Sequence, residues 1–519
     1  MSEFNLLDEK WISVLGVNGV TREVSLKEVF TDADEIISLA NELPTLDIAI
    51  MRLLLAIMHS AAAHDAKDYT SAMELWRSLW VNGLPAERIT AYLEQWRERF
   101  WLFDDKRPFG QVAEMKTGTE YKAGKLLGTM SESNNKPRLF PTRTGEEKTA
   151  VSYSEAARWL LYVNAYDDNS GKPSTRGAGL PSIGAGWLGQ LGLVYAVGAN
   201  LRETLLLNFF LLDREGNPWE RGTPFWEAEI QRTGERTGIN PPRSQAELLT
   251  LQSRRLSLKR ENGEVTGYRL LGGDFFPKEN AWVEQMTFWR KSSDKVNYVP
   301  KRHDPAKQLW RDFTSLTSTD NENERPGVVS WLAKIEYELE LNLQFSYATA
   351  SVVYGDKDFM VVGLAADSLS FNYALITNIG EEFLSVIGEL LSKTDAAVKE
   401  VGKFELDLAE ASGDRRDNKG YSSSSMKGKE NAAKQEAYFR LDIPFREWLA
   451  DTDPVSDDIT EITDAWLGTA KDILLKLGDE LVTRAGSTAF IGNGTKNSPN
   501  SHNFFVSKIR KILKEEANL

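Results

Sequence analysis

The feature that most constrains the fold is a change in the apolar pattern after Leu369. Beyond this residue, apolar side chains recur at the spacing of amphipathic helices, and a long polar insertion at 411–430 interrupts them. The helical segments span 376–391, 431–450, 462–481 and 503–515. Because such helices must bury their apolar faces against one another, residues 369–519 are predicted to form a four-helix bundle.

Residues 1–368 have a mixed pattern and are predicted to form a separate α/β domain. A hairpin is expected over 11–24, and Ser25 and Glu28 have the spacing of a capping box that opens a helix. Further helices are expected over 46–64, 87–103 and 153–166, a long polar loop over 112–150, and strand-like runs between 245 and 365. The predicted fold class is therefore α+β, with a large mixed α/β domain followed by the helical bundle.

Composition limits the possible environments. The 519 residues contain no cysteine, which excludes disulfides, thiol catalysis and cysteine-based zinc sites and agrees with a reducing cytoplasm. The most apolar stretch, 48–58, contains Arg52 and looks too short to span a bilayer. The first residues have no signal-peptide pattern. We therefore expect a cytoplasmic protein without membrane contact.

Charge is unevenly distributed along the chain. The net charge of −14 argues against a protein coated with nucleic acid. Basic side chains nevertheless gather at 253–260, 290–302 and 414–429. These runs are either ordinary solvated faces or strips that meet a phosphate backbone along a restricted path.

Six glycines lie between residues 177 and 192, an unusually dense cluster for this chain. Glycine has no Cβ and reaches positive φ easily, so its backbone can approach a narrow ligand or groove. The spelling of 184–189 matches the dinucleotide-binding fingerprint, but no strand is predicted before it, and the single match is weak. The alternative is a surface loop that uses glycine for tight turns.

Signals for catalysis are sparse. The four histidines are scattered, and no metal-binding, Walker or nucleophile-elbow motif is found. We therefore predict no catalytic residue, no metal site and no cofactor, and a binding protein rather than an enzyme. The alternative is a cytoplasmic enzyme that holds a nucleotide-like ligand at the glycine-rich loop 177–192.

Six phrases, taken in order, resemble the CasA family, the large subunit of the type I-E CRISPR Cascade surveillance complex. They are 4–12 (FNLLDEKWI), 99–111 (RFWLFDDKRPFGQ), 134–140 (NNKPRLF), 200–208 (NLRETLLLN), 251–255 (LQSRR) and 310–313 (WRDF). The similarity runs from the N-terminus to the predicted bundle.

The resemblance implies a non-catalytic subunit that reads the protospacer-adjacent motif in double-stranded target DNA and promotes duplex opening and R-loop formation. The implied partners are the backbone and small subunits of Cascade, the 5′ end of the guide CRISPR RNA, the target duplex and a helicase–nuclease that this subunit recruits. Base pairing to the guide would read the remaining sequence.

The resemblance also implies site residues. A glycine loop at the minor groove corresponds to Gly177-Ala178-Gly179 or Gly184 and Gly186. A basic finger in the same groove corresponds to Arg269, with Lys259 and Arg260 as rivals. These assignments are expectations carried over by position.

Two more elements follow from the resemblance. A wedge at a hairpin tip corresponds to Asp356, Lys357 and Asp358, where the family's usual glutamine is absent and two carboxylates add an electrostatic cost near DNA. A loop near the guide end offers amides, charge and a ring for stacking. Its residues are Asn134, Asn135, Lys136, Arg138 and Phe140.

Overall fold

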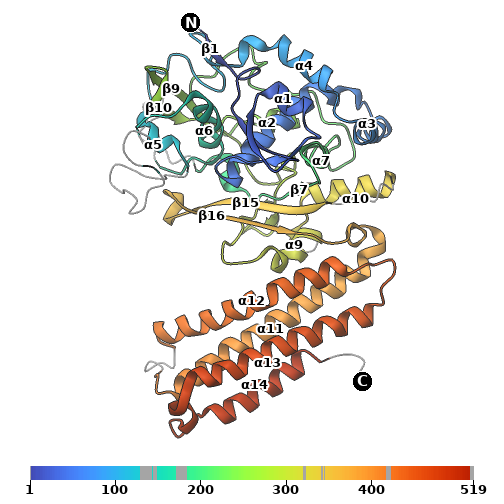
Figure 1. Cartoon of the computed structure of the whole chain (residues 1–519), viewed down its shortest axis with the longest axis vertical. Coiled ribbons are helices and arrows are strands. Elements are labelled where there is room, and N and C mark those ends of the chain that lie inside the picture. The colour runs from blue at the N-terminus through green and yellow to red at the C-terminus, as the bar shows by residue number, and fades with distance from the viewer. Residues whose placement is uncertain are drawn as a thin grey trace. The chain divides into compact units, whose positions relative to one another are not determined.

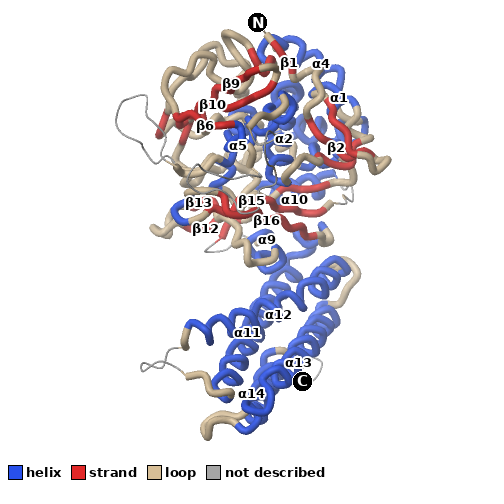
Figure 2. The backbone as a smooth tube through the Cα atoms, turned by 60° about the vertical axis from the view of Figure 1, so that its left-hand side comes forward, coloured by secondary structure: helices blue, strands red, loops and turns tan. Residues whose placement is uncertain are grey.

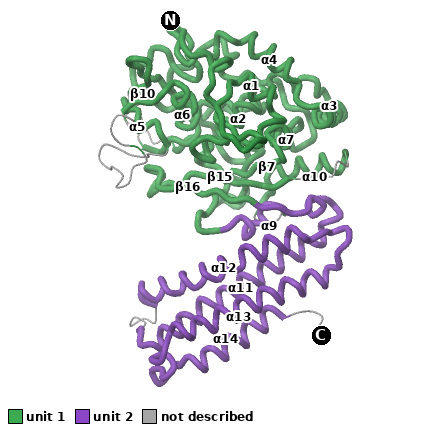
Figure 3. Tube along the Cα trace, in the orientation of Figure 1, with its two compact units in different colours: residues 1–307, 318–368 green, residues 308–317, 369–519 purple. Residues whose placement is uncertain are grey.

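The computed structural model divides into two compact units (Figure 3). It describes residues 2–128, 143, 149–170, 184–318, 323–339, 343, 345–415 and 422–514. Unit 1 comprises Met1–Lys307 and Ser318–Ser368, and unit 2 comprises Gln308–Thr317 and Leu369–Leu519. Unit 1 mixes helices and sheets, whereas unit 2 is helical, so the predicted α+β class is confirmed (Figure 1).

The centre of unit 1 is helix α2 (Pro44–Ala62), which is buried along nearly its whole length. The helices α4, α6, α7 and α8 and the strand β15 pack around it. This helix is longer than the apolar stretch 48–58, and by length and composition the segment Pro44–Asp65 could cross a membrane. The expected stretch 48–58 is thus part of a longer apolar helix, and 89% of the apolar 18-residue window in that segment is buried inside the structure, as in a core helix.

Several helices of unit 1 begin at capping residues. Ser25 and Glu28 form the predicted capping box, and Ser152 and Glu155 form another at α6. The helices are α1 (Leu26–Thr31), α2, α3 (Tyr69–Asn82), α4 (Ala86–Gln95), α5 (Ala123–Leu126), α6 (Tyr153–Tyr166), α7 (Leu201–Leu207), α8 (Gln245–Leu249) and α10 (Gly327–Leu339).

The strands of unit 1 form several small sheets rather than one large one (Figure 2). Within the described residues the sheet orders are β3-β2-β4, β1-β5, β6-β10-β9, β11-β8, β13-β12-β14 and β16-β15-β7. The strands are β1 (Glu3–Asn5), β2 (Ile12–Gly16), β3 (Thr21–Val24), β4 (Ile36–Leu39), β5 (Trp101–Phe103), β6 (Thr119–Lys122), β7 (Tyr195–Val197), β8 (Arg236–Thr237), β9 (Arg254–Glu261), β10 (Glu264–Gly272), β11 (Asp274–Phe275), β12 (Trp289–Lys291), β13 (Tyr298–Pro300), β14 (Asn323–Glu324), β15 (Ser346–Tyr354) and β16 (Val361–Leu369).

Two predicted elements differ from the structure. The helix expected over 87–103 ends at Gln95, and its last residues form β5, which pairs antiparallel with β1. The loop expected over 112–150 contains β6 and α5. In both places tertiary pairing with a distant strand, which a local pattern does not reveal, decides the conformation.

Unit 2 is built from long helices that lie side by side in Figures 1 and 2. The helices are α9 (Phe313–Thr317), α11 (Glu381–Ala411), α12 (Ser424–Asp451), α13 (Ile459–Ile491) and α14 (Ser498–Ile512). Trp466 of α13 lies in the core and donates a hydrogen bond to the Thr394 hydroxyl at 3.0 Å. The segment Gln308–Thr317 packs with this unit, because Trp310 stacks on Phe445 of α12 with ring centroids 4.6 Å apart.

Candidate nucleic-acid interface

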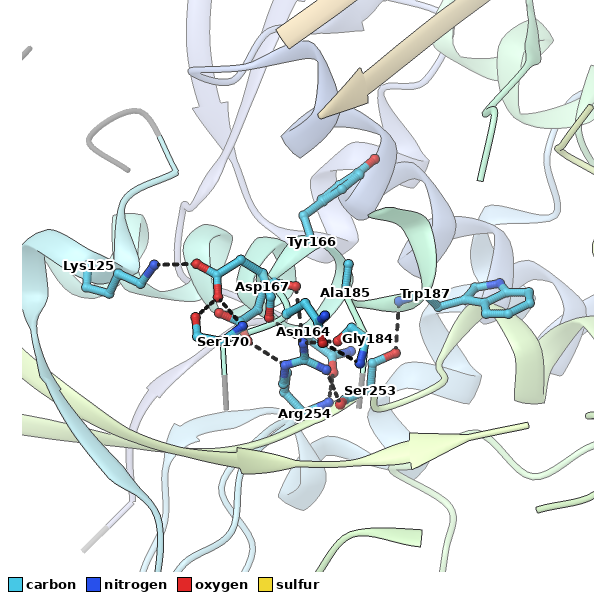
Figure 4. Close-up of polar contacts among 12 residues, drawn as sticks. Lys125, Asn164, Tyr166, Asp167, Ser170, Gly184, Ala185, Trp187, Ser253 and Arg254 are labelled. Atoms are coloured by element: carbon cyan, nitrogen blue, oxygen red, sulfur yellow. Dashed lines mark hydrogen bonds and ion pairs between the residues drawn. The ribbon is translucent and has the colours of Figure 1, made fainter. Parts of the chain in front are cut away.

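Arg254, the first residue of β9, joins the chain on both sides of the glycine-rich segment (Figure 4). Its guanidinium is fully buried and pairs with the Asp167 carboxylate at 2.5 Å. It also donates to the carbonyl oxygens of Asp167 (3.1 Å), Asp168 (3.0 Å) and Gly184 (2.9 Å). A buried charge needs this full set of partners, so Arg254 holds the chain at Asp167 and Asp168 in a fixed position relative to Gly184.

Asn169 links the same base to a distant hairpin. Its Oδ1 accepts a hydrogen bond from the Gly184 N–H at 2.8 Å. Its own N–H donates to the Asp358 carbonyl at 2.9 Å, and its Nδ2 donates to the Lys357 carbonyl at 3.1 Å. The structure therefore brings Gly184 of the predicted glycine loop close to the predicted wedge, because Asn169 contacts both Gly184 and Lys357, 188 positions further along the chain.

The turn between β15 and β16, residues 355–360, is held from a second side by Arg302. This guanidinium makes two bonds to the Asp358 carboxylate, at 2.7 and 3.0 Å. It also lies over the ring of Tyr354, 5.4 Å from the centroid. Because Arg302 balances Asp358, the electrostatic cost expected from two wedge carboxylates falls mainly on Asp356.

Lys357 is the exposed cation of this turn. Its backbone is left-handed, with φ of 54°, and Asp358 follows with φ of 60°. Among the described residues the ammonium group has no hydrogen bond or ion pair, whereas the other cations around the turn are engaged. A left-handed backbone conformation costs of order 1–3 kcal/mol for each non-glycine residue. It persists only where the surrounding contacts hold the backbone in that conformation.

Lys125 adds a partly buried positive charge beside the base. Its ammonium lies 3.0 Å from the Asp168 carboxylate. Burial alone would lower the pKa of Lys125, but the charges of Asp168 and Asp167 outweigh it and raise the pKa. Asp168 in turn accepts hydrogen bonds from the N–H of Ser170 at 2.9 Å and from its hydroxyl.

A buried ion pair anchors the segment that follows Gly186. The Trp187 indole donates to Glu284 at 2.8 Å, and Glu284 pairs with Arg52 of α2 through two bonds of 3.0 Å. Both charged side chains are almost inaccessible, at 3% for Arg52 and 1% for Glu284. The 3₁₀-helix Trp187–Gln190 is thus tied to the centre of unit 1.

The glycines within the described part have different roles. Gly184 has φ of +84° and is half-buried, so its backbone conformation favours glycine. Gly186 is buried, and a Cβ there would overlap the carbonyl of Ala165. Internal packing therefore explains Gly186, in place of the expected approach to a groove. Within the described residues, α6 is the element before Gly184 and a four-residue 3₁₀-helix follows Gly186, which is not the strand–turn–helix context of a dinucleotide-binding fingerprint.

The predicted basic finger residues lie on β9 and β10, away from the loop base. Arg269 pairs with Glu120 and donates to the Met115 carbonyl. Its neighbour Tyr268 is buried and reaches the Lys125 carbonyl. Adjacent strand residues point to opposite faces, so Arg269 points away from that base. Arg260 pairs with Glu3 and lies over Phe103, while Lys259 is 71% exposed and lies 3.0 Å from Glu261.

The basic run 253–260 is not a continuous phosphate-binding strip. Arg254 and Arg255 are buried and pair with Asp167 and Asp274, respectively. Only the later cations of the run reach the surface. These arginines stabilise the fold instead of facing a ligand. The sequence alone did not reveal this, because their carboxylate partners lie far away along the chain.

Several predicted residues lie outside the described part of the chain. They are Gly177, Ala178, Gly179, Asn134, Asn135, Lys136, Arg138 and Phe140. Conversely, sequence reasoning missed Asn169, Arg254 and Arg302. Arg254 and Arg302 lie in the basic runs 253–260 and 290–302, which the sequence analysis had noted. No local sequence pattern indicated Asn169.

Three comparisons place the chain among known proteins. The family model described as CRISPR-associated protein Cse1 matches residues 5–477, nearly the whole chain. The chain belongs to the Cse1 family. The CRISPR-associated protein CasA/Cse1 of Thermus thermophilus is 30% identical over 319 residues. That alignment covers 61% of this chain and only 60% of the relative's length.

Solved structures share the Cse1 fold along the full chain. The crystal structure of Thermobifida fusca Cse1 has a TM-score of 0.85 and 28% identity, with 98% of each chain covered. A chain of a structure titled CRISPR RNA-guided surveillance complex has a TM-score of 0.74 and 15% identity, covering 99% of this chain and 100% of that one. The second likeness concerns the fold alone.

Proposed function

We propose that this chain is the large, non-catalytic subunit of a type I-E CRISPR surveillance complex in the cytoplasm. In this role it recognises the protospacer-adjacent motif in the target duplex, starts strand separation and R-loop formation, and recruits a helicase–nuclease. Its partners are the backbone and small subunits, the 5′ end of the guide RNA and the target DNA. Membership of the Cse1 family supports this role.

The observation that carries the proposal is the junction made by Asn169. It joins the base of the glycine-rich segment to the turn that presents Lys357. A loop that enters a minor groove and a wedge that separates the adjacent base pair must be held in fixed register, because they act on neighbouring base pairs. Three hydrogen bonds of Asn169, two through its side chain and one from its backbone N–H, hold the two elements in that register.

Within this proposal, some contact residues are described by the structure and others are assigned from the sequence. Lys357 supplies the free charge at the wedge, and Gly177 to Gly179 supply a backbone without side chains; their assignment comes from the sequence. Asn134, Asn135, Lys136, Arg138 and Phe140 are proposed to face the guide end and the motif on the same basis. Lys259 is the most accessible finger candidate, since its side chain is 71% exposed, against 33% for Arg269 and 31% for Arg260.

Omission of the chain tests the proposal. The complex is assembled with guide RNA and the remaining subunits, with or without this chain, and target-duplex affinity is measured by gel shift. We expect loss of motif-dependent binding without the chain and its return when the chain is added back. Equal binding in both preparations would reject the proposed role.

A further inference from the structure

Unit 1 contains a cavity of about 500 Å³ that the recognition role does not use. Five arginines line it: Arg99 and Arg107 from the segment around β5, and Arg232, Arg236 and Arg243 from the segment before α8. We call it the arginine pocket. Its volume is in the range of cavities that hold nucleotide-sized ligands.

The acidic side chains of the arginine pocket do not balance its charge. Asp274 and Glu247 are the carboxylates that line it. Asp274 accepts bonds from Arg236 at 2.8 Å, from Arg232 at 3.3 Å and from the buried Arg255 at 2.5 Å. Three guanidinium groups thus share one carboxylate, which has no capacity left for Arg99 or Arg107.

Arg99 and Arg107 carry the uncompensated charge. In the described part of the chain the Arg99 guanidinium has no hydrogen bond or ion pair, although the residue is half-buried. The Arg107 guanidinium donates to neutral backbone carbonyls, those of Ala228 and Glu229, and its backbone N–H donates to the Asp104 carboxylate at 2.7 Å. Burial lowers the pKa of Arg99 and the charge of Arg107 lowers it further, while the nearby Asp104 carboxylate opposes the shift. Two positive charges are therefore held close together at one cavity, with Asp104 as the acidic group near them, in a chain whose net charge is −14.

The remaining lining suits the other parts of a nucleotide. Phe225, which packs over the buried Trp226, gives the pocket aromatic surface, and Asn240 and Gln252 give amide donors and acceptors. Aromatic rings stack on bases, and amides pair with base edges or sugar hydroxyls. Guanidinium groups bind phosphate oxygens in pairs.

We propose that the arginine pocket binds the phosphate of a nucleotide, either free or at the end of a nucleic-acid strand. Arg99, Arg107 and Arg232 contact the phosphate oxygens, and the aromatic wall receives the base. This site is separate from the junction at Asn169 and from the target-recognition role.

Calorimetry on the full chain tests this site with three probes: ATP, a trinucleotide with a 5′-phosphate, and adenosine. The variants are Arg99→Gln and Arg232→Gln. The control is Arg510→Gln, which removes an exposed arginine of α14 in unit 2. Thermal melting checks that each variant folds.

We expect ATP, the trinucleotide or both to bind with a stoichiometry of one, while adenosine gives no signal. Arg99→Gln and Arg232→Gln should each weaken binding by about tenfold or more, because each removes a charge-assisted contact, and Arg510→Gln should change nothing. Binding of ATP alone identifies a free nucleotide, and binding of the trinucleotide identifies a strand end. No binding of either phosphate probe, or binding that both pocket variants retain, would overturn the proposal.

Discussion

At the scale of single residues, buried charges with complete sets of partners position the candidate interface. Arg254 fixes the base of the glycine-rich segment, and Arg52 and Glu284 fix the residues after it. A buried pair contributes little net stability against an apolar replacement, yet removal of one member is costly because the other charge stays buried. These arginines therefore specify geometry more than they add stability.

The first prediction concerns Glu284→Gln. It leaves Arg52 buried without its carboxylate and should lower the free energy of unfolding by about 3–5 kcal/mol. Chemical denaturation followed by tryptophan fluorescence measures the change. Glu220→Gln is the control, because that carboxylate is 66% exposed and its pair with Arg243 spans 3.8 Å. Equal losses in the two variants would contradict the buried-pair account.

The second prediction concerns pH. Burial, with a smaller contribution from His64, lowers the pKa of His59 to about 3. The unfolded chain takes up a proton near pH 6.5 while the folded chain does not, so the contribution of His59 to stability is present above that pH and is lost as the pH falls toward 3. Between pH 7 and 5, wild type should lose about 2 kcal/mol relative to His59→Phe.

Denaturant titrations of both proteins at pH 7 and 5 measure this difference. The comparison with the variant matters because burial raises the pKa of Asp47 to about 6, which favours the folded state as the pH falls from 6 toward 3.8. Asp47 contributes equally in both proteins and cancels. Parallel pH profiles would show that His59 does not titrate as described.

At the scale of elements, the 3₁₀-helix Trp187–Gln190 meets the end of β15 so closely that a side chain has no room. A Cβ on Gly189 would overlap the hydroxyl of Tyr354, which donates to the Tyr166 carbonyl at 2.6 Å. This contact sets how near the hairpin end approaches the residues after the glycine-rich segment.

The third prediction is a double-mutant cycle at this contact. Gly189→Ala should destabilise the protein by about 1–3 kcal/mol through overpacking. Tyr354→Phe removes the overlapping oxygen and a hydrogen bond worth about 1 kcal/mol. In the double variant the total loss should be smaller than the sum of the two single losses, because removing the Tyr354 oxygen relieves the closest overlap and leaves the ring carbon Cζ nearest, 2.9 Å from the added Cβ. Additive losses would exclude direct contact.

The sequence predicts individual elements well and their pairing poorly. Periodicity located α2, α6 and the long helices of unit 2, and the capping box at Ser25 was confirmed. The polar insertion at 411–430 is shorter than expected, because α12 begins at Ser424. Charge patterns could not separate the buried Arg254 from the exposed Lys259, since burial depends on partners such as Asp167, 87 residues away.

At the scale of the whole molecule, the proposed role brings an acidic chain to DNA through few cations, so target binding should have a modest dependence on salt. Each phosphate contact contributes about 0.9 to the slope of log affinity against log salt concentration. Our fourth prediction is that Lys357→Ala, in the assembled complex, lowers this slope by about that amount. Lys476→Ala, an exposed lysine of α13, should leave the slope unchanged. Equal slopes for wild type and Lys357→Ala would remove Lys357 from the contact set.

The most direct test follows strand separation itself. A target duplex carries 2-aminopurine at the base pair beside the protospacer-adjacent motif, and the assembled complex is added. Fluorescence should rise with wild type and with Lys476→Ala. It should rise far less with Lys357→Ala or with Asn169→Ala, which breaks two of the bonds between the loop base and the turn. A full rise with both interface variants would contradict the claim that this junction opens the duplex.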